Sequence, residues 1–195
     1  MNITQRAKKI KLLLTDVDGV LTDGKMYFLP GPDGKLVDFN GFNAVDGIGL
    51  LLVRSFGITT GMITGRVSPS AEKRAQMLSM KYVYQGFLSK YEPFLDILKH
   101  CKLKPHQVAY MGDDWTDIPI LKKVGLACAP NSARPEVKKA AHYVTKRDGG
   151  DGAMRELCDL ILRSQGNWKK IMTQVETADW KPLAREKVII VKNRR

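Results

Sequence analysis

Short apolar runs alternate with segments of helical periodicity along most of the chain, and this alternation limits the fold more than any other feature. The runs typical of buried strands are 12–15, 58–63, 81–84, 108–111, 126–129 and 143–145. The segments typical of helices are 44–56, 68–80, 89–100, 116–124, 134–141 and 151–163. Strands that alternate with helices of this length form strand–helix–strand units. We therefore predict an α/β fold, in which a parallel sheet carries helices on both faces.

One short segment interrupts this alternation after the first predicted strand. Two half-apolar stretches, Met26–Leu29 and Leu36–Phe39, flank a loop of proline, glycine and aspartate at positions 30–34. Proline and glycine mark turns, and two short strand-like stretches around such a turn are typical of a hairpin. We predict a small β-hairpin over about residues 25–40.

The composition is that of an ordinary globular domain. The chain has 195 residues, of which 44% are hydrophobic and 27% charged, enough to bury a substantial core. No apolar run approaches the roughly 20 residues that cross a bilayer, and the N-terminal apolar stretch shows no signal-peptide cleavage site. Cys101, Cys128 and Cys158 lie far apart in apolar surroundings, which is typical of structural thiols in a reducing compartment. We expect a cytoplasmic protein without a membrane partner.

The formal net charge of +12 raises the question of a nucleic-acid partner. No RNA-binding signature, zinc finger or basic amphipathic repeat accompanies this charge, and a basic surface can equally attract small anions such as phosphate esters. Part of the charge lies in segment 166–195, which is polar, basic and poorly periodic. We expect residues 1–165 to form the domain, residues 166–195 to be a basic C-terminal appendage, and no nucleic acid to bind.

Polar side chains follow the predicted strands at the points where the strands end. Because ligands of parallel sheets gather beyond the carboxyl ends of the strands, these side chains are expected to share one edge of the sheet. They are Asp16 and Asp18 after the first strand, Thr64 and Arg66 after the second, residues 86–90 after the third, and Asp113, Asp114 and Asp117 after the fourth.

The pair Asp16 and Asp18 has two simpler interpretations. A calcium-binding EF-hand loop that began at Asp16 would need glycine at its sixth position and glutamate at its twelfth, but these positions hold Leu21 and Tyr27. A pair of solvated turn aspartates would suit an isolated Asp-x-Asp-Gly segment. The polar clusters expected at the same edge of the sheet make a turn without function the weaker interpretation.

Together these groups suit the transfer of a phosphoryl group to an aspartate. Asp16 is the candidate nucleophile, which would form an aspartyl-phosphate. Asp18, two residues later, is the candidate general acid and base, which would protonate the departing alcohol and then deprotonate water. A carboxylate can attack phosphorus only where both negative charges are offset, so the site needs Mg²⁺ and fixed hydrogen-bond donors.

The remaining clusters supply those groups. Thr64 is expected to donate its hydroxyl to the phosphate, and Lys90 is expected to provide a compact positive charge. Asp113 would complete the oxygen shell of Mg²⁺, in which Asp16 and Asp18 also take part. Asp114 and Asp117 are expected to orient the metal, its waters or Lys90.

The motifs that carry these residues resemble those of the haloacid dehalogenase superfamily of phosphatases. The matching stretches are TDVDGVLTDG, MITGR, Lys90 at the end of YQGFLSK, and MGDDWTDIP, and they run in order over most of the chain from about residue 9 to residue 163. This resemblance implies a Rossmann-like sheet, Mg²⁺ as cofactor and an aspartyl-phosphate route.

A narrower resemblance rests on the absence of a large insertion after the first motif. Only the hairpin and FNAVDGIGL stand there, and the chain continues with VGLACAPNSARPEVKKAAHYVT and GGDGAMRELCDLIL. This layout is similar to that of 3-deoxy-D-manno-octulosonate 8-phosphate phosphatases, which lack a cap domain. The resemblance implies a homotetramer built by the hairpin, in which the glycine-rich segment 149–156 reaches a neighbouring subunit's active site.

The same resemblance places a sugar-acid phosphate in the site. Arg66 would bind the substrate's phosphate or carboxylate through its two-pronged guanidinium, with Gly65 beside it, and Asp46 and Gly47 would lie near the sugar. Positions 45 and 48 differ from the family pattern, which leaves nonulosonate 9-phosphates as alternative substrates.

Two further classes of function remain open from the sequence. One is a phosphatase of the same superfamily that acts on another phosphate ester. The other is a binder of nucleic acid or of a membrane surface that keeps only the fold; phosphate-backbone binding would make its affinity depend steeply on salt.

Overall fold

Seven parallel strands form the central sheet of the protein. The computed structural model describes residues 1–180 and 187–193, and the strand order is β8-β7-β6-β1-β4-β5-β9. Every neighbouring pair in this sheet is parallel. The strands are β1 (Leu12–Thr15), β4 (Thr59–Thr64), β5 (Tyr82–Gln85), β6 (Val108–Met111), β7 (Leu126–Ala129), β8 (Tyr143–Val144) and β9 (Ile189–Lys192). The predicted parallel α/β architecture is confirmed.

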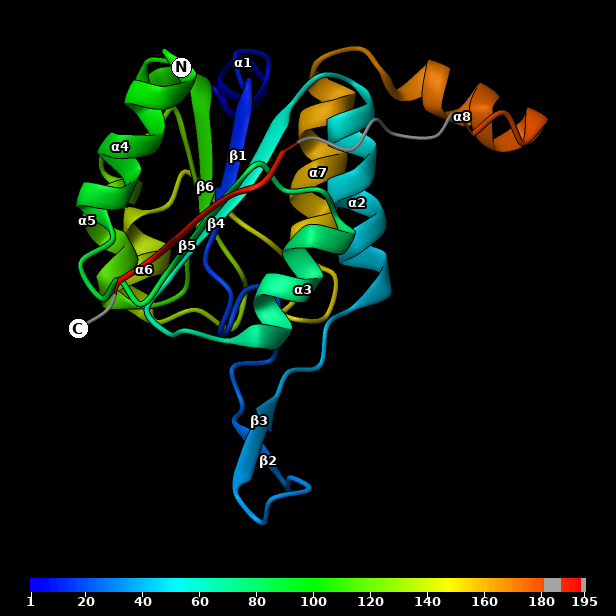
Figure 1. Cartoon of the computed structure of the whole chain (residues 1–195). Coiled ribbons are helices and arrows are strands. Elements are labelled where there is room, and N and C mark those ends of the chain that lie inside the picture. The colour runs from blue at the N-terminus through cyan, green and yellow to red at the C-terminus, as the bar shows by residue number, and fades with distance from the viewer. Residues whose placement is uncertain (181–186, 194–195) are drawn as a thin grey trace.

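Helices cover both faces of the sheet, as Figure 1 shows. On one face α1 (Ile3–Ala7), α2 (Ala44–Ser55), α3 (Pro69–Met77) and α7 (Ala153–Ser164) enclose one hydrophobic core. On the other face α4 (Tyr91–Cys101), α5 (Ile118–Leu121) and α6 (Pro135–Ala140) enclose a second core. Strand β1 contributes side chains to both cores, because successive side chains of a strand point to opposite faces. Leu13 belongs to the first core, and Leu12 and Leu14 belong to the second.

Strands β1 and β6 end level with each other, β4 continues two residues further, and this alignment positions the site. Thr15, the last residue of β1, lies opposite Met62 of β4 on one side and Met111 of β6 on the other. The loops that follow these three strands therefore meet at the carboxyl edge of the sheet. Backbone hydrogen bonds continue past β1, since the N–H of Asp16 donates to the carbonyl of Met111 at 2.9 Å.

Local sequence explains how the loop after β4 is held. The side chain of Ser68 accepts a hydrogen bond from the backbone N–H of Ala71 and caps the first turn of α3. Pro69 occupies the first position of α3, where a missing N–H costs no helical hydrogen bond. The backbone N–H of Ser68 donates to the buried side chain of Gln85, at 2.8 Å. The loop that carries residues 65–67 is thus fixed at its far end.

A β-hairpin is the insertion between β1 and α2, and no cap domain is present there. Its strands, β2 (Tyr27–Pro30) and β3 (Leu36–Phe39), pair in antiparallel fashion, and the hairpin projects away from the sheet and its helices (Figure 1). The prediction of a hairpin over residues 25–40 is confirmed. Most of its side chains are exposed, including large apolar ones such as Phe28, Leu29 and Leu36.

The C-terminal segment differs from the appendage expected over residues 166–195. Helix α8 (Trp168–Thr177) contributes Ile171 to the first core, and β9 lies parallel to β5 as the edge strand of the sheet, with Ile189 opposite Tyr82. The described part of this segment is therefore integral to the fold, while residues 181–186 and 194–195 lie outside the described residues. No helix in the described part of the chain is long and apolar enough to cross a membrane.

Candidate active site

The first charged group beyond β1 is Asp16, and it is nearly enclosed. Its side chain is 9% exposed, and its Oδ2 lies 2.6 Å from the Nζ of Lys90. Its Oδ1 accepts a hydrogen bond from the backbone N–H of Val17, at 2.6 Å. Both oxygens of a buried carboxylate thus have a donor, and the side chain is held in one orientation. A fixed, paired carboxylate at this place can act as a nucleophile toward a ligand at the sheet edge.

Lys90 lies between two buried carboxylates. Its Nζ is 2.7 Å from Oδ1 of Asp117, in addition to the contact with Asp16, and its side chain is only 2% exposed. The hydroxyl of Tyr110 donates to the same oxygen of Asp117, at 2.6 Å. Oδ2 of Asp117 accepts from the backbone N–H groups of Asp113 and Asp114. The fully buried Asp117 therefore ties Lys90 to the loop after β6.

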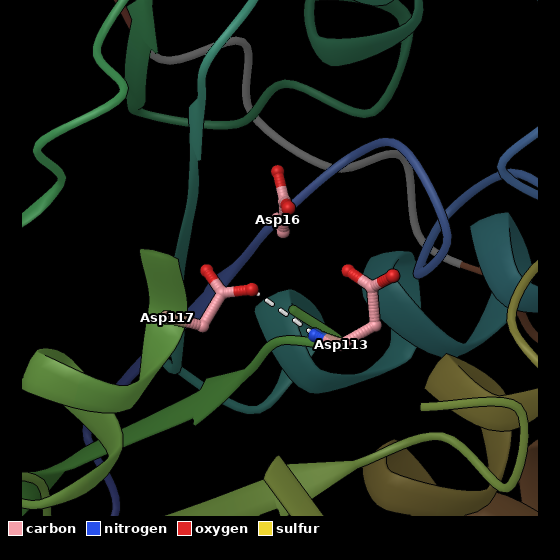
Figure 2. A group of neighbouring side chains, drawn as sticks. All are labelled: Asp16, Asp113 and Asp117. Atoms are coloured by element: carbon pink, nitrogen blue, oxygen red, sulfur yellow. Dashed lines mark hydrogen bonds between the residues drawn. The ribbon is translucent and has the colours of Figure 1, made fainter. Parts of the chain in front are cut away.

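Asp113 supplies the third carboxylate of the cluster. Figure 2 shows Asp16, Asp113 and Asp117 gathered at the carboxyl edge of the sheet, and oxygens of the three lie within 4.8 Å of one another. Oδ1 of Asp113 is buried without a hydrogen-bond partner among the residues that the structure describes. A Cβ at Gly19 would lie 2.2 Å from Oδ2 of Asp113, and Gly19 has a φ of +81°. Only glycine fits there.

The protonation of the cluster reflects its burial. Burial raises the pKa of Asp16 to about 8; Lys90 opposes this shift, and Asp117 reinforces it. Burial likewise raises the pKa of Asp113 to about 7, with Asp117 adding to the effect. For Lys90, burial lowers the pKa, but the two carboxylates beside it outweigh burial and raise the pKa above its ordinary value. The negative charge of the carboxylates at this edge therefore exceeds the positive charge that lies close to them.

These residues fit a hard divalent cation. Carboxylate oxygens are the ligands that Mg²⁺ prefers, and Asp113 has a buried oxygen with no other partner in the described part of the chain. A cation there would offset the burial and the neighbouring negative charge that together raise the pKa values of Asp16 and Asp113. The acidic group includes Asp117 instead of the predicted ligand Asp18, but all the oxygens of Asp117 already accept hydrogen bonds from protein donors. Each oxygen of Asp117 has two protein donors, whereas each oxygen of Asp16 has one and Oδ1 of Asp113 has none in the described part of the chain, so Asp16 and Asp113 have the more available oxygens.

Asp18 stands on the more open side of the site. Its side chain is 23% exposed, and its Oδ1 lies 3.1 Å from Nη1 of Arg66. Burial raises the pKa of Asp18, while Arg66 acts against the shift. The other guanidinium nitrogen of Arg66, Nη2, contacts the carboxylate of Asp38 in the hairpin. A carboxylic acid with a raised pKa, beside an arginine and partly open to solvent, can donate a proton to a leaving group.

Thr64 is the last residue of β4, and Gly65 follows it in the loop. Thr64 is 1% exposed, and its Oγ1 accepts a weak hydrogen bond from the backbone N–H of Arg66, at 3.3 Å. Its hydroxyl hydrogen remains available for an acceptor. A Cβ at Gly65 would lie 3.1 Å from a methyl carbon of Leu88, so the loops after β4 and β5 approach closely here.

Some predicted site residues have other surroundings in the structure. The carboxylate of Asp46, a buried residue, accepts hydrogen bonds from the backbone N–H groups of Gly152 and Arg155, and so caps the start of α7. Gly47 faces α3, because a Cβ there would lie 2.3 Å from Nη2 of Arg74. Asp114 is 60% exposed and accepts from the backbone N–H of Trp115. The structure therefore gives these three residues contacts that stabilise helices or loops.

The glycine-rich segment near α7 packs within its own chain. A Cβ at Gly149 would lie 1.8 Å from the carbonyl oxygen of Gly19, and one at Gly150 would lie 2.5 Å from the backbone nitrogen of Asp23. The N–H of Gly150 donates to the carbonyl of Val20, at 3.0 Å. These glycines let the segment lie directly on the loop after β1, and its expected reach into a neighbouring subunit stays a prediction.

Sequence reasoning missed two residues of this site. Tyr110 lies inside the apolar run 108–111, where it resembles an ordinary core residue, and its position seven residues before Asp117 was the available signal. Asp38 lies in the hairpin, where nothing in the local pattern separates it from a solvated charge. Its contact with Arg66 spans 28 residues of sequence.

The fold is that of the haloacid dehalogenase-like hydrolases. A family model described as haloacid dehalogenase-like hydrolase matches residues 64–157. The 3-deoxy-D-manno-octulosonate 8-phosphate phosphatase of Yersinia pestis is 42% identical over 164 residues, which cover 84% of this chain and 86% of the relative. The phosphatase of the same name from Escherichia coli K12 is 41% identical over 165 residues, covering 85% and 86%.

A solved structure supports the same assignment. The 3-deoxy-D-manno-octulosonate 8-phosphate phosphatase of Moraxella catarrhalis, in complex with magnesium, phosphate and a KDO molecule, has a TM-score of 0.84 and 32% identity, and the match covers 89% of this chain and 97% of that one. The chain therefore belongs to the 3-deoxy-D-manno-octulosonate 8-phosphate phosphatase family of haloacid dehalogenase-like hydrolases.

Proposed function

We propose that the protein hydrolyses 3-deoxy-D-manno-octulosonate 8-phosphate to 3-deoxy-D-manno-octulosonate and phosphate, with Mg²⁺ as cofactor. The observation that carries this proposal is the arrangement of the buried Asp16 and Lys90 with the half-buried Asp113 at the carboxyl edge of the sheet. The family membership supports the choice of substrate, and the magnesium complex of the Moraxella catarrhalis relative supports the choice of metal.

Asp16 and Asp113 are the residues that we propose to hold the metal. When bound, Mg²⁺ supplies positive charge that offsets the charges of the phosphate and of the attacking carboxylate. Asp18, the other ligand that we expected, has its Oδ1 directed to Arg66; we keep it as a ligand in the proposal through its remaining oxygen atoms. Asp117 supports the site through Lys90 and the backbone of the loop after β6.

In the first half of the reaction an oxygen of Asp16 attacks phosphorus. A bond forms between that oxygen and phosphorus, and the bond between phosphorus and the sugar oxygen breaks. Asp18 gives its proton to the departing alkoxide, a role that its raised pKa favours. Lys90 and the hydroxyl of Thr64 hold the transferring phosphoryl group by charge and hydrogen bonding. The result is an aspartyl-phosphate on Asp16 and the free sugar acid.

In the second half water replaces the enzyme as the phosphoryl acceptor. Asp18, now ionised, takes a proton from that water, the water oxygen bonds to phosphorus, and the bond to Asp16 breaks. Asp16 is nearly enclosed, whereas Asp18 and Arg66 are partly exposed, so we expect water to enter from their side. One carboxylate therefore serves as acid and then as base, and the two halves together return the site to its starting charge.

The hairpin supports a homotetramer as the working form. Its large apolar side chains are exposed, with Leu36 at 70% and Phe28 and Leu29 at 56% each. A two-stranded hairpin is only marginally stable in water by itself, and exposed apolar patches of this kind mark contact surfaces. We propose that other copies of this chain cover the hairpin. The free cysteines, two of them buried, fit the reducing cytoplasm, where we place the protein.

The test of the proposed function is phosphate release in the presence of Mg²⁺ from three substrates. They are 3-deoxy-D-manno-octulosonate 8-phosphate, a nonulosonate 9-phosphate and a hexose phosphate. We expect kcat/KM to be highest for the eight-carbon acid. A preference for the nine-carbon acid would favour the alternative substrate and would direct attention to Val45 and Ile48, which are exposed in the first turns of α2. Equal rates on all three would contradict a sugar-acid phosphatase.

A further inference from the structure

The guanidinium of Arg66 joins two carboxylates from distant parts of the chain. Nη1 lies 3.1 Å from Oδ1 of Asp18, in the loop after β1, and Nη2 contacts Oδ2 of Asp38, in strand β3 of the hairpin. The three side chains are between 23% and 29% exposed. Arg66 thus stands at the boundary between the site and solvent: Nη2 engages Asp38, and Nη1 engages Asp18 and also contacts Sδ of Met26.

Asp38 is unusual within the hairpin. Every other residue of β2 and β3 is exposed, whereas Asp38 is half-buried because it turns toward Arg66. The hairpin also carries Asp33, which pairs with Lys35 at 3.3 Å, but both of those side chains are mostly exposed. The contact with Arg66 therefore makes Asp38 the acidic residue that links the hairpin to the site.

Two carboxylate partners fix the orientation of a guanidinium better than one partner does. Arginine donates in a planar fork, so a second carboxylate removes much of the rotational freedom that a single contact leaves. With Asp38 alone removed, Arg66 would keep Asp18 as its charged partner, beside the contact with Met26, and Nη2 would be free to turn. With Asp38 present, the guanidinium is held across the open side of the site, beside the candidate proton donor.

We propose that Asp38 is a positioning residue for substrate recognition: it holds Arg66 where the carboxylate end of a sugar-acid phosphate meets it. This inference rests on the proposed function, since a substrate without a second anionic group would have no use for Arg66 in this place. It also gives the hairpin a role in the site of its own chain, apart from its role in assembly.

The experiment compares Asp38→Asn with the parent protein on two substrates. One is 3-deoxy-D-manno-octulosonate 8-phosphate; the other is p-nitrophenyl phosphate, which carries no carboxylate. We expect Asp38→Asn to lower kcat/KM for the sugar acid about tenfold, mainly through KM, since a hydrogen bond to a charged group is at stake. We expect less than a twofold change with p-nitrophenyl phosphate, which also shows that the variant folds with an intact site.

Two further variants isolate the proposed role. Asp33→Asn removes a charge from the same hairpin at a residue that pairs with Lys35 and not with Arg66. It should leave kcat/KM unchanged for both substrates. The double variant Asp38→Asn/Arg66→Gln should be no slower on the sugar acid than Arg66→Gln alone, because Asp38 acts through Arg66.

Unchanged kinetics in Asp38→Asn, equal losses on both substrates, or additive losses in the double variant would each overturn the proposal. Failure of the proposed function would be recognised separately. In that case the parent protein itself would show no preference for the sugar-acid phosphate over p-nitrophenyl phosphate.

Discussion

The Nζ of Lys90 lies 2.6 Å from Oδ2 of Asp16, and this contact joins the loop after β5 to the end of β1. The same nitrogen contacts Asp117 at 2.7 Å, and all three side chains are almost completely buried. A buried ion pair of this kind is costly to assemble, because both charges lose water. We propose that this costly pair at the end of the central strand serves the reaction, where a fixed positive charge next to a nucleophilic carboxylate is useful.

Removal of the lysine charge should weaken both the fold and the reaction. Lys90→Gln leaves Asp16 and Asp117 without their shared cation, and breaking such a buried pair costs about 3 kcal/mol or more. We expect a fall in the unfolding temperature, measured by calorimetry, and a loss of at least a hundredfold in kcat. Lys122→Gln, at an exposed lysine of the same domain, is the control. Wild-type kcat in Lys90→Gln would exclude Lys90 from the reaction.

Tyr110 should contribute to the site through Asp117. Tyr110→Phe removes the donor to Oδ1 of Asp117 and should cost about 1–2 kcal/mol of stability, together with a severalfold loss in kcat because Lys90 is held less firmly. Tyr84→Phe is a matched control, since Tyr84 bonds to Asp96 of α4. It should lose stability only. Equal kinetic effects in the two variants would argue against a specific role of Tyr110.

The metal-free protein should lose stability as the pH rises from 6.5 to 8. Burial raises the pKa of Asp16 to about 8 and that of Asp113 to about 7, so in this range the folded state holds protons that the unfolded state has lost. Unfolding free energy falls with pH under that condition. We expect a loss of about 1–2 kcal/mol in the presence of a chelator, measured by denaturant titration.

Magnesium should reverse this pH dependence. The metal binds the ionised carboxylates, so its stabilising effect should be larger at pH 8 than at pH 6.5. Thermal unfolding with and without Mg²⁺ at the two pH values measures the difference. The unfolding free energy of the metal-free protein could instead rise over this range, or the effect of Mg²⁺ could be larger at the lower pH. Either result would contradict the raised pKa values of Asp16 and Asp113 in the folded state.

Asp113→Asn should have opposite effects on the metal-free and the metal-bound protein. It removes one of the crowded carboxylates, so the metal-free protein should unfold at a temperature about 2–4 °C higher at pH 8. It also removes a metal ligand, so the shift caused by Mg²⁺ should largely disappear. Asp114→Asn, at the exposed neighbour, should change neither quantity. A metal response that survives in Asp113→Asn would exclude Asp113 as a ligand.

The local sequence was sufficient for most of the sheet and for the acidic residues of the site. Strand 108–111 was predicted with its observed bounds, and the aspartates follow the strand ends because loops after parallel strands share one edge. Strand β9 was not predicted as part of the sheet, because its pairing with β5 joins residues such as Ile189 and Tyr82 that are far apart in sequence. Edge pairing of this kind leaves no local pattern.

Side-chain contacts across the fold were equally beyond local inference. The pair Arg66 and Asp38 depends on the angle at which the hairpin leaves the sheet, and no periodicity encodes that angle. Asp46 was expected near the sugar because the resemblance to the phosphatase family implies it. In the structure its carboxylate caps α7, an arrangement that depends on how α2 and α7 pack.

The central claim, that Asp16 is the nucleophile of a phosphatase, is tested most directly by one comparison. Phosphate release from 3-deoxy-D-manno-octulosonate 8-phosphate is measured with Mg²⁺ for the parent protein and for Asp16→Asn, whose fold is checked by calorimetry. We expect rapid release by the parent and at least a thousandfold lower kcat in the folded variant, because an amide cannot form the aspartyl-phosphate. A folded Asp16→Asn variant that kept more than a tenth of the parent activity would contradict the claim.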